Sequence, residues 1–356
     1  MKKQVPQSIL IIVQRSNGDV FLSSPLIDGL FRAYGNPQID LLVNSDTLAV
    51  AGMLPNIRNI HVFSYALGRS GQTLGLIRKI ARRYDLSISL TASDRSVLFA
   101  LVSGRRSFSA VEKQLKKSWW KRFLLSANYE FDTCRHIIEN NTQALGLLGI
   151  GSERVILGSR HSQQASERVD SMLESKGIGE FLIFHPGAQY DYKVYPEKLR
   201  NRLLEELASL GVKIVVTGSK SPLDLRIKRS LPALGNVFDF IGETSMDELF
   251  ALNARSLAYI GADTLNMHIA ASQNKRIFAI FGPTVLSMWS PWCNELHGGT
   301  RVNKPVQTYG NVTLFQADMP CVGCGKTGCD DNHGISECLY HIDPLVIKNE
   351  VGQWLL

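Results

Sequence analysis

The sequence predicts an α/β protein built from two doubly wound, Rossmann-like domains. Three observations lead to this prediction. The chain has 356 residues, too many for one ordinary core and enough for two domains. Short aliphatic runs alternate with helical patterns, as in βαβ units with parallel sheets. That alternation stops at a polar stretch, residues 159–170, and then starts again.

The first half contains four apolar runs that indicate buried strands, at residues 9–14, 39–43, 59–63 and 86–90. Helical patterns at residues 20–34, 71–83 and 93–102 separate them. A turn is expected at Asn17-Gly18, after the first strand. This order of elements favours a parallel sheet covered by helices.

In the second half, strands are expected at residues 181–184, 213–217, 237–241, 257–260 and 276–281. Helices are expected at residues 197–210, 246–253 and 344–356. The predicted divisions are therefore an N-terminal domain at 1–165, a C-terminal domain at 166–342 and a closing helix at 343–356. We expect the domains to face a central cleft, with the ligand outside the carboxyl ends of the strands.

The positive charge of the chain is concentrated in its first half. The net charge is +7, and residues 1–165 hold 21 Lys and Arg against 11 Asp and Glu, whereas the remainder holds 18 against 21. Such a half should attract an anionic partner, such as nucleic acid, a phosphorylated glycolipid or an acidic membrane surface. A solvated basic surface is the simpler alternative.

One segment, residues 113–129, predicts an amphipathic helix in which tryptophans stand beside lysines. The expected polar face carries Lys117, Lys121 and Arg122. The expected apolar face, which Lys113 and Lys116 interrupt, carries Leu115, Trp119, Trp120, Phe123, Leu124 and Ala127. A membrane interface suits this composition, and packing on its own domain with a basic outer face suits it equally. The longest aliphatic run, residues 9–13, is too short to cross a bilayer, so we expect a cytoplasmic protein, either free or peripheral on the inner membrane.

Two segments of the second half suit the binding of a diphosphate. The first is His185-Pro186-Gly187-Ala188 at a strand end, followed by Lys193 and by a helix that begins after Pro196. Backbone amides, a helix N-terminus and a lysine together supply positive potential, although a plain turn would look similar. The second segment, residues 261–271, contains Asp263, Thr264 and His268 and precedes Phe281-Gly282-Pro283-Thr284. Its alternative interpretation is a helix N-cap with a buried core histidine.

The order of these motifs resembles the heptosyltransferase family of GT-B glycosyltransferases, glycosyltransferase family 9. The matching motifs are HPGA, KxxP, VVTG, IGETS, DTxxxH and FGPT over residues 181–290, with Asn17-Gly18-Asp19-Val20 near the start. The resemblance implies an inverting transfer of heptose from ADP-heptose to the lipopolysaccharide core, or a related lipid-linked saccharide, without a catalytic metal. It also implies an N-terminal domain that binds an anionic glycolipid acceptor and a C-terminal domain that binds the nucleotide sugar.

The resemblance further assigns roles to individual residues. Asp19 aligns with the general base, for which the alternative is an N-cap of the following helix. Lys193 aligns with the lysine that contacts the donor diphosphate. The positions expected to bind the donor are Gly187, Ala188, Lys193, Asp224, Thr244, Asp263, Thr264 and His268. Leu265 departs from the family, which has glycine there, and its side chain should narrow the approach to the diphosphate.

Four cysteines gather near the end of the chain: Cys321, Cys324, Cys329 and Cys338. In a reducing compartment this spacing suggests a structural zinc or iron ion more than disulfides, and unliganded thiols are the alternative. Other functions also remain open. A GT-B transferase could use another nucleotide sugar or acceptor, such as a protein or a capsule. A nucleic-acid-binding module would explain the basic half, but it would not need the ordered glycine, lysine and aspartate motifs.

Overall fold

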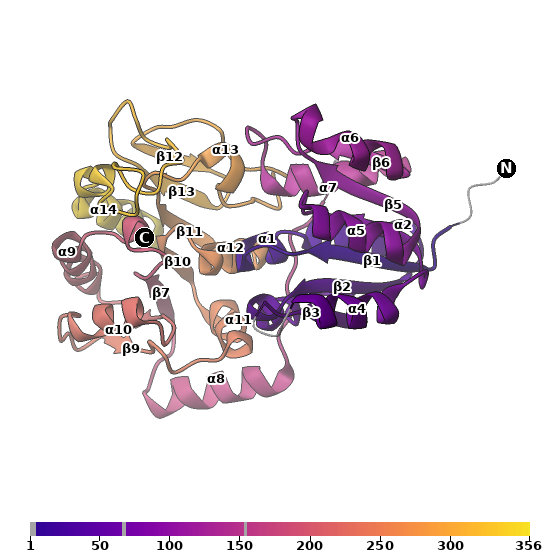
Figure 1. Ribbon diagram of the computed structural model, residues 1–356. Helices are drawn as coiled ribbons and strands as arrows, with labels where there is room; N and C mark the ends of the chain where they lie inside the picture. Colours follow the sequence, from indigo (N-terminus) through magenta and orange to yellow (C-terminus); the bar gives the residue numbers. More distant parts are fainter. Residues whose placement is uncertain (1–4, 66–68, 153–154) are drawn as a thin grey trace. The chain divides into compact units, whose positions relative to one another are not determined.

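The computed structural model describes residues 5–65, 69–152 and 155–356. It divides into two compact units, one ending at Arg160 and the other beginning at His161 (Figure 1). This division lies a few residues before the predicted boundary at 165/166. The reason is α8 (Gln163–Ser175), which starts the second unit. Its N-cap, Ser162, accepts a hydrogen bond from the Ala165 amide and donates one to Asp247 of the same unit (2.7 Å).

The first unit contains, in its described residues, a six-stranded sheet in the order β3-β2-β1-β4-β5-β6 with every pair parallel. The strands are β1 (Ser8–Val13), β2 (Gln38–Asn44), β3 (Asn59–Phe63), β4 (Tyr84–Ser89), β5 (Gly104–Val111) and β6 (Ala127–Glu130). The four predicted strands are confirmed. The pattern missed β5 and β6, because β5 alternates polar with apolar residues and β6 lies at the edge of the sheet.

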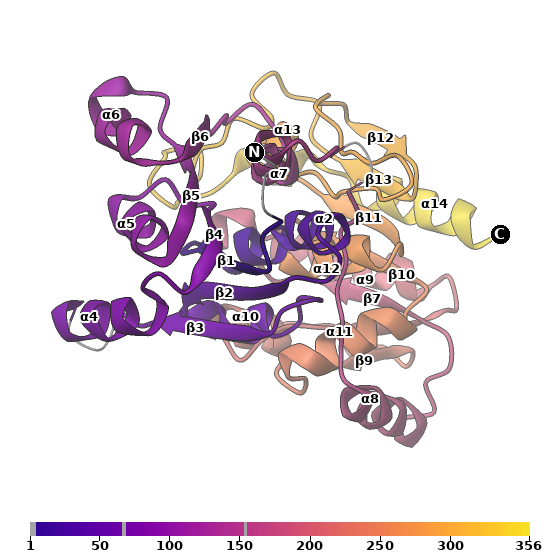
Figure 2. The same cartoon turned by 90° about the vertical axis from the view of Figure 1, so that its right-hand side faces the viewer.

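Helices cover both faces of this sheet. The helical segments are α1 (Asn17–Phe21), α2 (Ser24–Ala33), η1 (Ser45–Thr47), α3 (Leu48–Ala51), α4 (Arg69–Ile80), α5 (Asp94–Ser103), α6 (Leu115–Leu124) and α7 (Ile137–Leu148). In Figure 2, α4, α5 and α6 lie on one face, and α2 and α7 lie on the other. The predicted turn at Asn17-Gly18 is wrong, because these residues form the first turn of α1. The predicted helix at 20–34 is interrupted at Leu22 and Ser23, where the Ser23 hydroxyl donates to the Val20 carbonyl (2.7 Å).

The prediction for residues 113–129 is partly wrong. The helix ends at Leu124, and the chain then joins the edge of the sheet as β6, so Ala127 belongs to a strand. Lys121, expected on the polar face, is fully buried, whereas Lys117 of the same face is exposed. The helix therefore packs with Ser118 and Lys121 inward.

The second unit contains, in its described residues, a seven-stranded sheet in the order β12-β13-β11-β10-β7-β8-β9. The strands are β7 (Phe181–His185), β8 (Lys213–Val216), β9 (Val237–Asp239), β10 (Ala258–Ala262), β11 (Arg276–Ile280), β12 (Val306–Tyr309) and β13 (Val312–Phe315). The five predicted strands are confirmed. The pattern missed the antiparallel hairpin of β12 and β13, which extends the sheet beyond β11.

The helical segments of this unit are α8, η2 (Asp191–Lys193), α9 (Glu197–Ala208), α10 (Pro222–Arg229), α11 (Met246–Arg255), α12 (Leu265–Ser272), α13 (Leu286–Trp289), η3 (Glu337–His341) and α14 (Pro344–Leu355). The predicted closing helix is confirmed as α14. It packs against α9 and contributes Ile347 and Val351 to a core shared with Leu203, Leu204 and Leu207 of α9. The last segment is therefore part of the second unit. No helix among the described residues is long and apolar enough to span a bilayer.

The amino ends of the strands in the first sheet carry an ion pair whose carboxylate is buried. Asp40 is 2% exposed and accepts two hydrogen bonds from the Arg58 guanidinium (2.9 and 2.7 Å) and one from the Tyr84 hydroxyl (2.8 Å). Burial alone would raise the pKa of Asp40. The hydrogen bonds from His61, Arg58 and Tyr84 outweigh burial and hold that pKa well below its usual range.

Replacing Asp40 with Asn should destabilise the protein by about 2 kcal/mol at neutral pH, because the charged partner of Arg58 is lost. A carboxyl group whose pKa is lowered by folding stabilises the protein above its unfolded pKa, and this contribution disappears as the pH falls. The difference in unfolding free energy between parent and variant should therefore shrink below about pH 4. Urea unfolding from pH 3 to 7 measures it. Asp28→Asn, which removes an exposed ion pair with Arg32, is the control and should cost less than about 1 kcal/mol. Equal losses of unfolding free energy in Asp40→Asn and Asp28→Asn would contradict this role of the Asp40 carboxylate.

Candidate active site

An ion pair between Lys193 and Asp263 lies at the carboxyl edge of the second sheet. Lys193 ends η2, in the loop after β7, and Asp263 directly follows β10. The two strands are neighbours, so their carboxyl ends bring the loops together. The Lys193 ammonium donates to Asp263 Oδ2 at 2.9 Å, and the side chains are 26% and 9% exposed. The sequence placed both residues in the donor site, and the structure brings them into contact.

The pair holds both of its members in the charged form. Burial lowers the pKa of Lys193, but the charge and the hydrogen bond of Asp263 outweigh it, so the pKa lies above its ordinary value. Burial raises the pKa of Asp263. The Lys193 charge, the neighbouring His268 and a hydrogen bond from Thr284 outweigh that effect and lower it. The edge therefore presents a fixed, partly accessible cation.

His268 lies beside this pair as a neutral imidazole. It belongs to α12 and is 3% exposed, and burial lowers its pKa to about 4 against the attraction of Asp263. Its Nδ1 is buried and has no hydrogen-bond partner among the described residues. A buried polar nitrogen without a partner is costly, so this atom is a natural contact for a ligand.

The N-terminus of α12 points its free amides toward the same edge. Thr264 is the N-cap, and within the described residues its side chain makes no capping hydrogen bond. The first amides of the helix are thus available to an anion, and the helix dipole favours one. Leu265, half-buried, is the first residue of the helix, so its side chain lies where the family has only a hydrogen atom.

Glycines at two positions allow neighbouring segments to approach closely at this edge. A Cβ on Gly187 would lie 2.0 Å from Asp224 Oδ1, and Asp224 cannot withdraw easily because the Ser219 amide and hydroxyl both donate to its other oxygen (2.7 and 2.6 Å). Gly261 is equally constrained, since a Cβ there would meet the His185 carbonyl oxygen at 2.3 Å. Ala188 is half-buried next to Gly187.

Asp224 lies in the first turn of α10, and Thr244 lies in the loop after β9 at the same edge. Asp224 is 6% exposed, and its carboxylate is engaged by Ser219, so it shapes the loop after β8. Thr244 is half-buried in the loop after β9, just before the capping box that Ser245 and Glu248 form at the start of α11. The Gly242 amide donates to the Gly218 carbonyl (2.9 Å) and joins these two loops.

Sequence reasoning missed the polar residues that support the site. His185 Nδ1 contacts the Thr217 hydroxyl (2.9 Å), and Thr217 in turn accepts from the Asn266 amide (3.3 Å). Asn253 donates to Asn266 (2.7 Å). Thr217 and Thr284 stand within the VVTG and FGPT motifs, which could have identified them. Asn253 and Asn266 carry no such signal, because buried asparagines in helices have no fixed spacing.

Asp19 lies at the carboxyl edge of the sheet in the first unit. It is 5% exposed and is the third residue of α1, which follows β1. The N-cap alternative is wrong, because Ser16 is the N-cap and its hydroxyl donates to Asp19 Oδ2 (2.6 Å). Arg15 Nε lies 3.0 Å from Asp19 Oδ1. Asp19 is thus a carboxylate held by two side chains, neither of which was among the predicted site residues.

Several arginines and lysines of the first unit lie at the opposite edge. Arg83 precedes β4, and Arg105 and Arg106 begin β5. Lys79 and Arg83 line a cavity of about 370 Å³ around Asp40. These cations are therefore at the amino ends of the strands, whereas Asp19 is at the carboxyl ends.

The four clustered cysteines lie in a loop that packs against the Lys193 segment. Ser336 donates to the Tyr192 carbonyl (2.6 Å), and the ring of His333 packs on Tyr190 and Tyr192. Burial and, after it, the neighbouring thiols raise the pKa of Cys338 to about 11. The exposed thiols are Cys321, Cys324 and Cys329. Among the described residues no group of three or more His, Cys, Asp or Glu is placed to hold a metal ion, so the thiols as arranged do not form a ligand set.

Solved structures share this architecture over nearly the whole chain. Escherichia coli ADP-heptose lipopolysaccharide heptosyltransferase II superposes with a TM-score of 0.72 at 18% identity and covers 98% of each chain. Heptosyltransferase WaaC of E. coli, solved with ADP, gives 0.71 at 15% identity and covers 97% of this chain and 99% of that one. The protein therefore has the GT-B fold, as predicted.

The sequence comparisons define the family. Residues 73–308 match glycosyltransferase family 9 (heptosyltransferase). Lipopolysaccharide heptosyltransferase 3 of E. coli is 24% identical over 299 residues, covering 79% of this chain and 85% of the relative. The chain belongs to glycosyltransferase family 9 and is a glycosyltransferase, which confirms the family predicted from the motifs.

Proposed function

We propose that this enzyme transfers heptose from ADP-heptose to the lipopolysaccharide core or to a related lipid-linked saccharide. The observation that carries the proposal is the Lys193–Asp263 pair beside the free N-terminus of α12, in a member of family 9. A cation and helix amides converging on one edge suit the diphosphate of a nucleotide sugar. Relatives named as lipopolysaccharide heptosyltransferases support heptose as the sugar and the core as the acceptor.

In this proposal Lys193 stabilises the leaving group. When the anomeric carbon leaves the diphosphate oxygen, negative charge grows on ADP, and an ammonium held in place can stabilise it without reorganisation. Asp263 orients Lys193 and leaves two of its three N–H donors for the phosphate oxygens. The α12 amides add positive potential, so the step is proposed to need no catalytic metal.

Asp19 is proposed as the general base. Its carboxylate would take the proton from the acceptor hydroxyl as that oxygen bonds to the anomeric carbon from the face opposite the diphosphate, which inverts the configuration. Ser16 and Arg15 would hold the carboxylate in position. The proposed acceptor is an anionic glycolipid. We therefore propose, together with the function, that the enzyme acts in the cytoplasm at the inner membrane.

One residue favours a second candidate function. Leu265 at the first position of α12 narrows the approach to the helix amides, so a different nucleotide sugar or acceptor, such as a protein or a capsule, is the alternative. A nucleic-acid partner is not proposed, because a nucleic-acid-binding module would not need the ordered glycine, lysine and aspartate motifs.

ADP-sugars should stabilise the enzyme more than UDP- or GDP-sugars, because a ligand that binds only the folded state raises its stability by mass action. Thermal unfolding with each nucleotide sugar at equal concentration measures the effect. ADP-heptose should give the largest shift. A larger shift with UDP-N-acetylglucosamine would remove the ADP assignment and would favour the second candidate function.

Replacing Asp19 with Asn should leave folding and donor binding intact but slow transfer by about a hundredfold or more, because Asn keeps the shape of the side chain and cannot accept the proton. Transfer is measured with ADP-heptose and a heptose-deficient core acceptor. Asp28→Asn is the control. Near-parental transfer by Asp19→Asn would mean that the base lies elsewhere.

A structural zinc or iron ion on Cys321, Cys324, Cys329 and Cys338 is a separate proposal, which rests on the spacing of the cysteines. Binding would require the exposed thiols to draw together. Elemental analysis of the purified protein should then find about one metal ion per chain, and chelation should weaken ADP binding, because the loop packs on the Lys193 segment. Metal-free protein with four titratable thiols in this loop would remove the proposal.

A further inference from the structure

The orientation of α6 differs from that of an ordinary surface helix, because two polar side chains face its own unit and most of its large apolar side chains face outward. Ser118 and Lys121 are fully buried, whereas Trp119 is 66% exposed and Phe123 is 83% exposed. Sequence periodicity alone left both orientations open.

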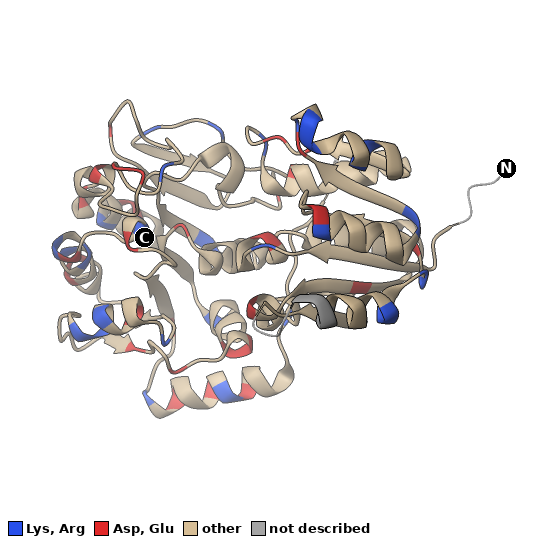
Figure 3. Ribbon diagram, in the orientation of Figure 1, with Lys and Arg blue, Asp and Glu red and all other residues tan. Residues whose placement is uncertain are grey.

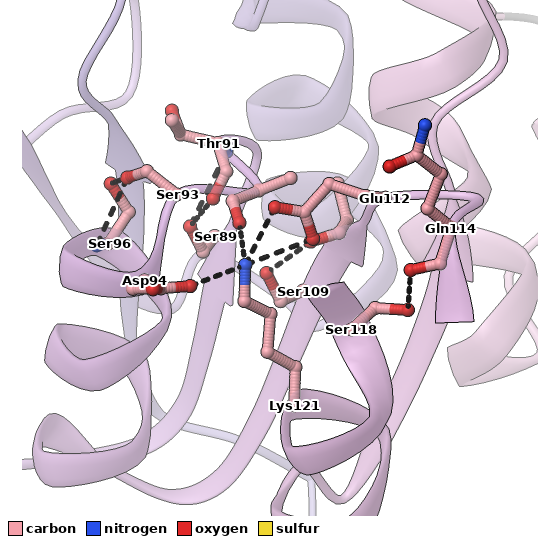
Figure 4. Close-up of polar contacts among 12 residues, drawn as sticks. Ser89, Thr91, Ser93, Asp94, Ser96, Ser109, Glu112, Gln114, Ser118 and Lys121 are labelled. Carbon is pink, nitrogen blue, oxygen red and sulfur yellow. Dashed lines mark hydrogen bonds and ion pairs between the residues drawn. The ribbon is translucent and has the colours of Figure 1, made fainter. Parts of the chain in front are cut away.

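A buried lysine fixes this orientation. The Lys121 ammonium contacts both oxygens of Glu112 (2.8 and 2.9 Å), Asp94 (2.8 Å) and the Ala92 carbonyl (2.5 Å), as Figure 4 shows. An ammonium taken out of water is costly unless it is paired, and here two carboxylates pair it. Turning the helix to bury its apolar side would break these contacts.

A second set of contacts anchors the same side of the helix. Arg122 donates to the Ser118 hydroxyl (3.0 Å) and to Glu130 (2.9 Å). Trp120 packs partly on Val97, Val111 and Leu125, so it belongs to the anchored side. Trp119, the other tryptophan, does not.

The outward side of α6 forms what we term the apolar stripe. It consists of Leu115, Trp119, Phe123 and Leu124, of which the first three are spaced four residues apart along one side of the helix. Lys113, Lys116 and Lys117 are exposed beside or within it. Lys and Arg recur on α6 and on β5 of the same unit (Figure 3).

We propose that the apolar stripe docks onto the headgroup region of an anionic lipid bilayer. Tryptophan and phenylalanine insert at this depth, and lysines beside them reach the phosphates with their long side chains. A second copy of the chain fits the stripe less well. In a twofold dimer the same patch meets itself, and the three lysines of each copy would face one another.

This docking surface rests on the proposed function, because an enzyme with a lipid-linked acceptor must reach that acceptor in a bilayer. Ala92 and Asp94, which hold Lys121, follow the carboxyl end of β4. The stripe is therefore anchored at the edge of the sheet where Asp19 lies.

The test is co-sedimentation of the full chain with vesicles, without donor or acceptor. We expect the parent to bind vesicles of phosphatidylglycerol and phosphatidylethanolamine and to bind phosphatidylcholine vesicles weakly. The double variant Trp119→Ser/Phe123→Ser should bind anionic vesicles about tenfold less tightly, because most of the inserted apolar area is lost. Its unfolding temperature should be unchanged, because both side chains are exposed.

Two further variants keep the test independent of folding. Lys116→Glu/Lys117→Glu should weaken binding to anionic vesicles and leave binding to phosphatidylcholine unchanged. Leu296→Ser, which removes a 55% exposed leucine of the second unit, is the control and should bind as the parent does. The proposal is overturned if the parent ignores anionic vesicles, if the double variant binds them equally, or if light scattering shows a parent dimer that the double variant breaks. Vesicle binding without heptose transfer would leave this proposal standing and remove only the proposed function.

Discussion

The ion pair of Lys193 and Asp263 is the interaction on which the proposed chemistry of this glycosyltransferase depends. Each residue is partly or largely buried, and each keeps its charge because the other is 2.9 Å away. The pair fixes a cation beside the N-terminus of α12. A flexible surface lysine could bind a diphosphate too, but it would have to be ordered at each turnover. The pairing removes that cost.

The parallel sheets decide where such groups can gather. The loops that follow the parallel strands of a sheet meet at one edge. At that edge of the second sheet, Gly187 allows the loop after β7 to approach Asp224 of α10, and Gly261 of β10 lies against the His185 carbonyl of β7. The amino edge of the first sheet is occupied differently, by the ion pair of Asp40 with Arg58. We therefore propose separate roles for the two edges, one in stability and one in the proposed chemistry. The cysteine-bearing loop belongs to the chemical edge, since it packs on the segment that carries Lys193.

Sequence patterns predicted the fold class and nine strands and singled out Lys193 and Asp263, because buried parallel strands are continuous apolar runs and the loops after them carry ordered motifs. They failed where tertiary contacts override local pattern. β5 and β6 are partly polar. The amphipathic pattern of α6 fits either orientation of the helix, and the contacts of Lys121 with Glu112 and Asp94 decide between them. The sequence gives no sign of the supporting role of Asn266 for the same reason, because its hydrogen-bond partners are distant in the sequence.

The most direct measurement is the affinity of ADP for the parent and for Lys193→Met, determined by calorimetry at several salt concentrations. Met keeps the length of the side chain and removes its charge. The account predicts at least about tenfold weaker binding and a shallower dependence on salt, because one charge-assisted contact to the diphosphate is lost. Lys228→Met, which removes a lysine paired with Asp239 in the same unit, should bind as the parent does. Equal affinity for the parent and Lys193→Met would contradict the account.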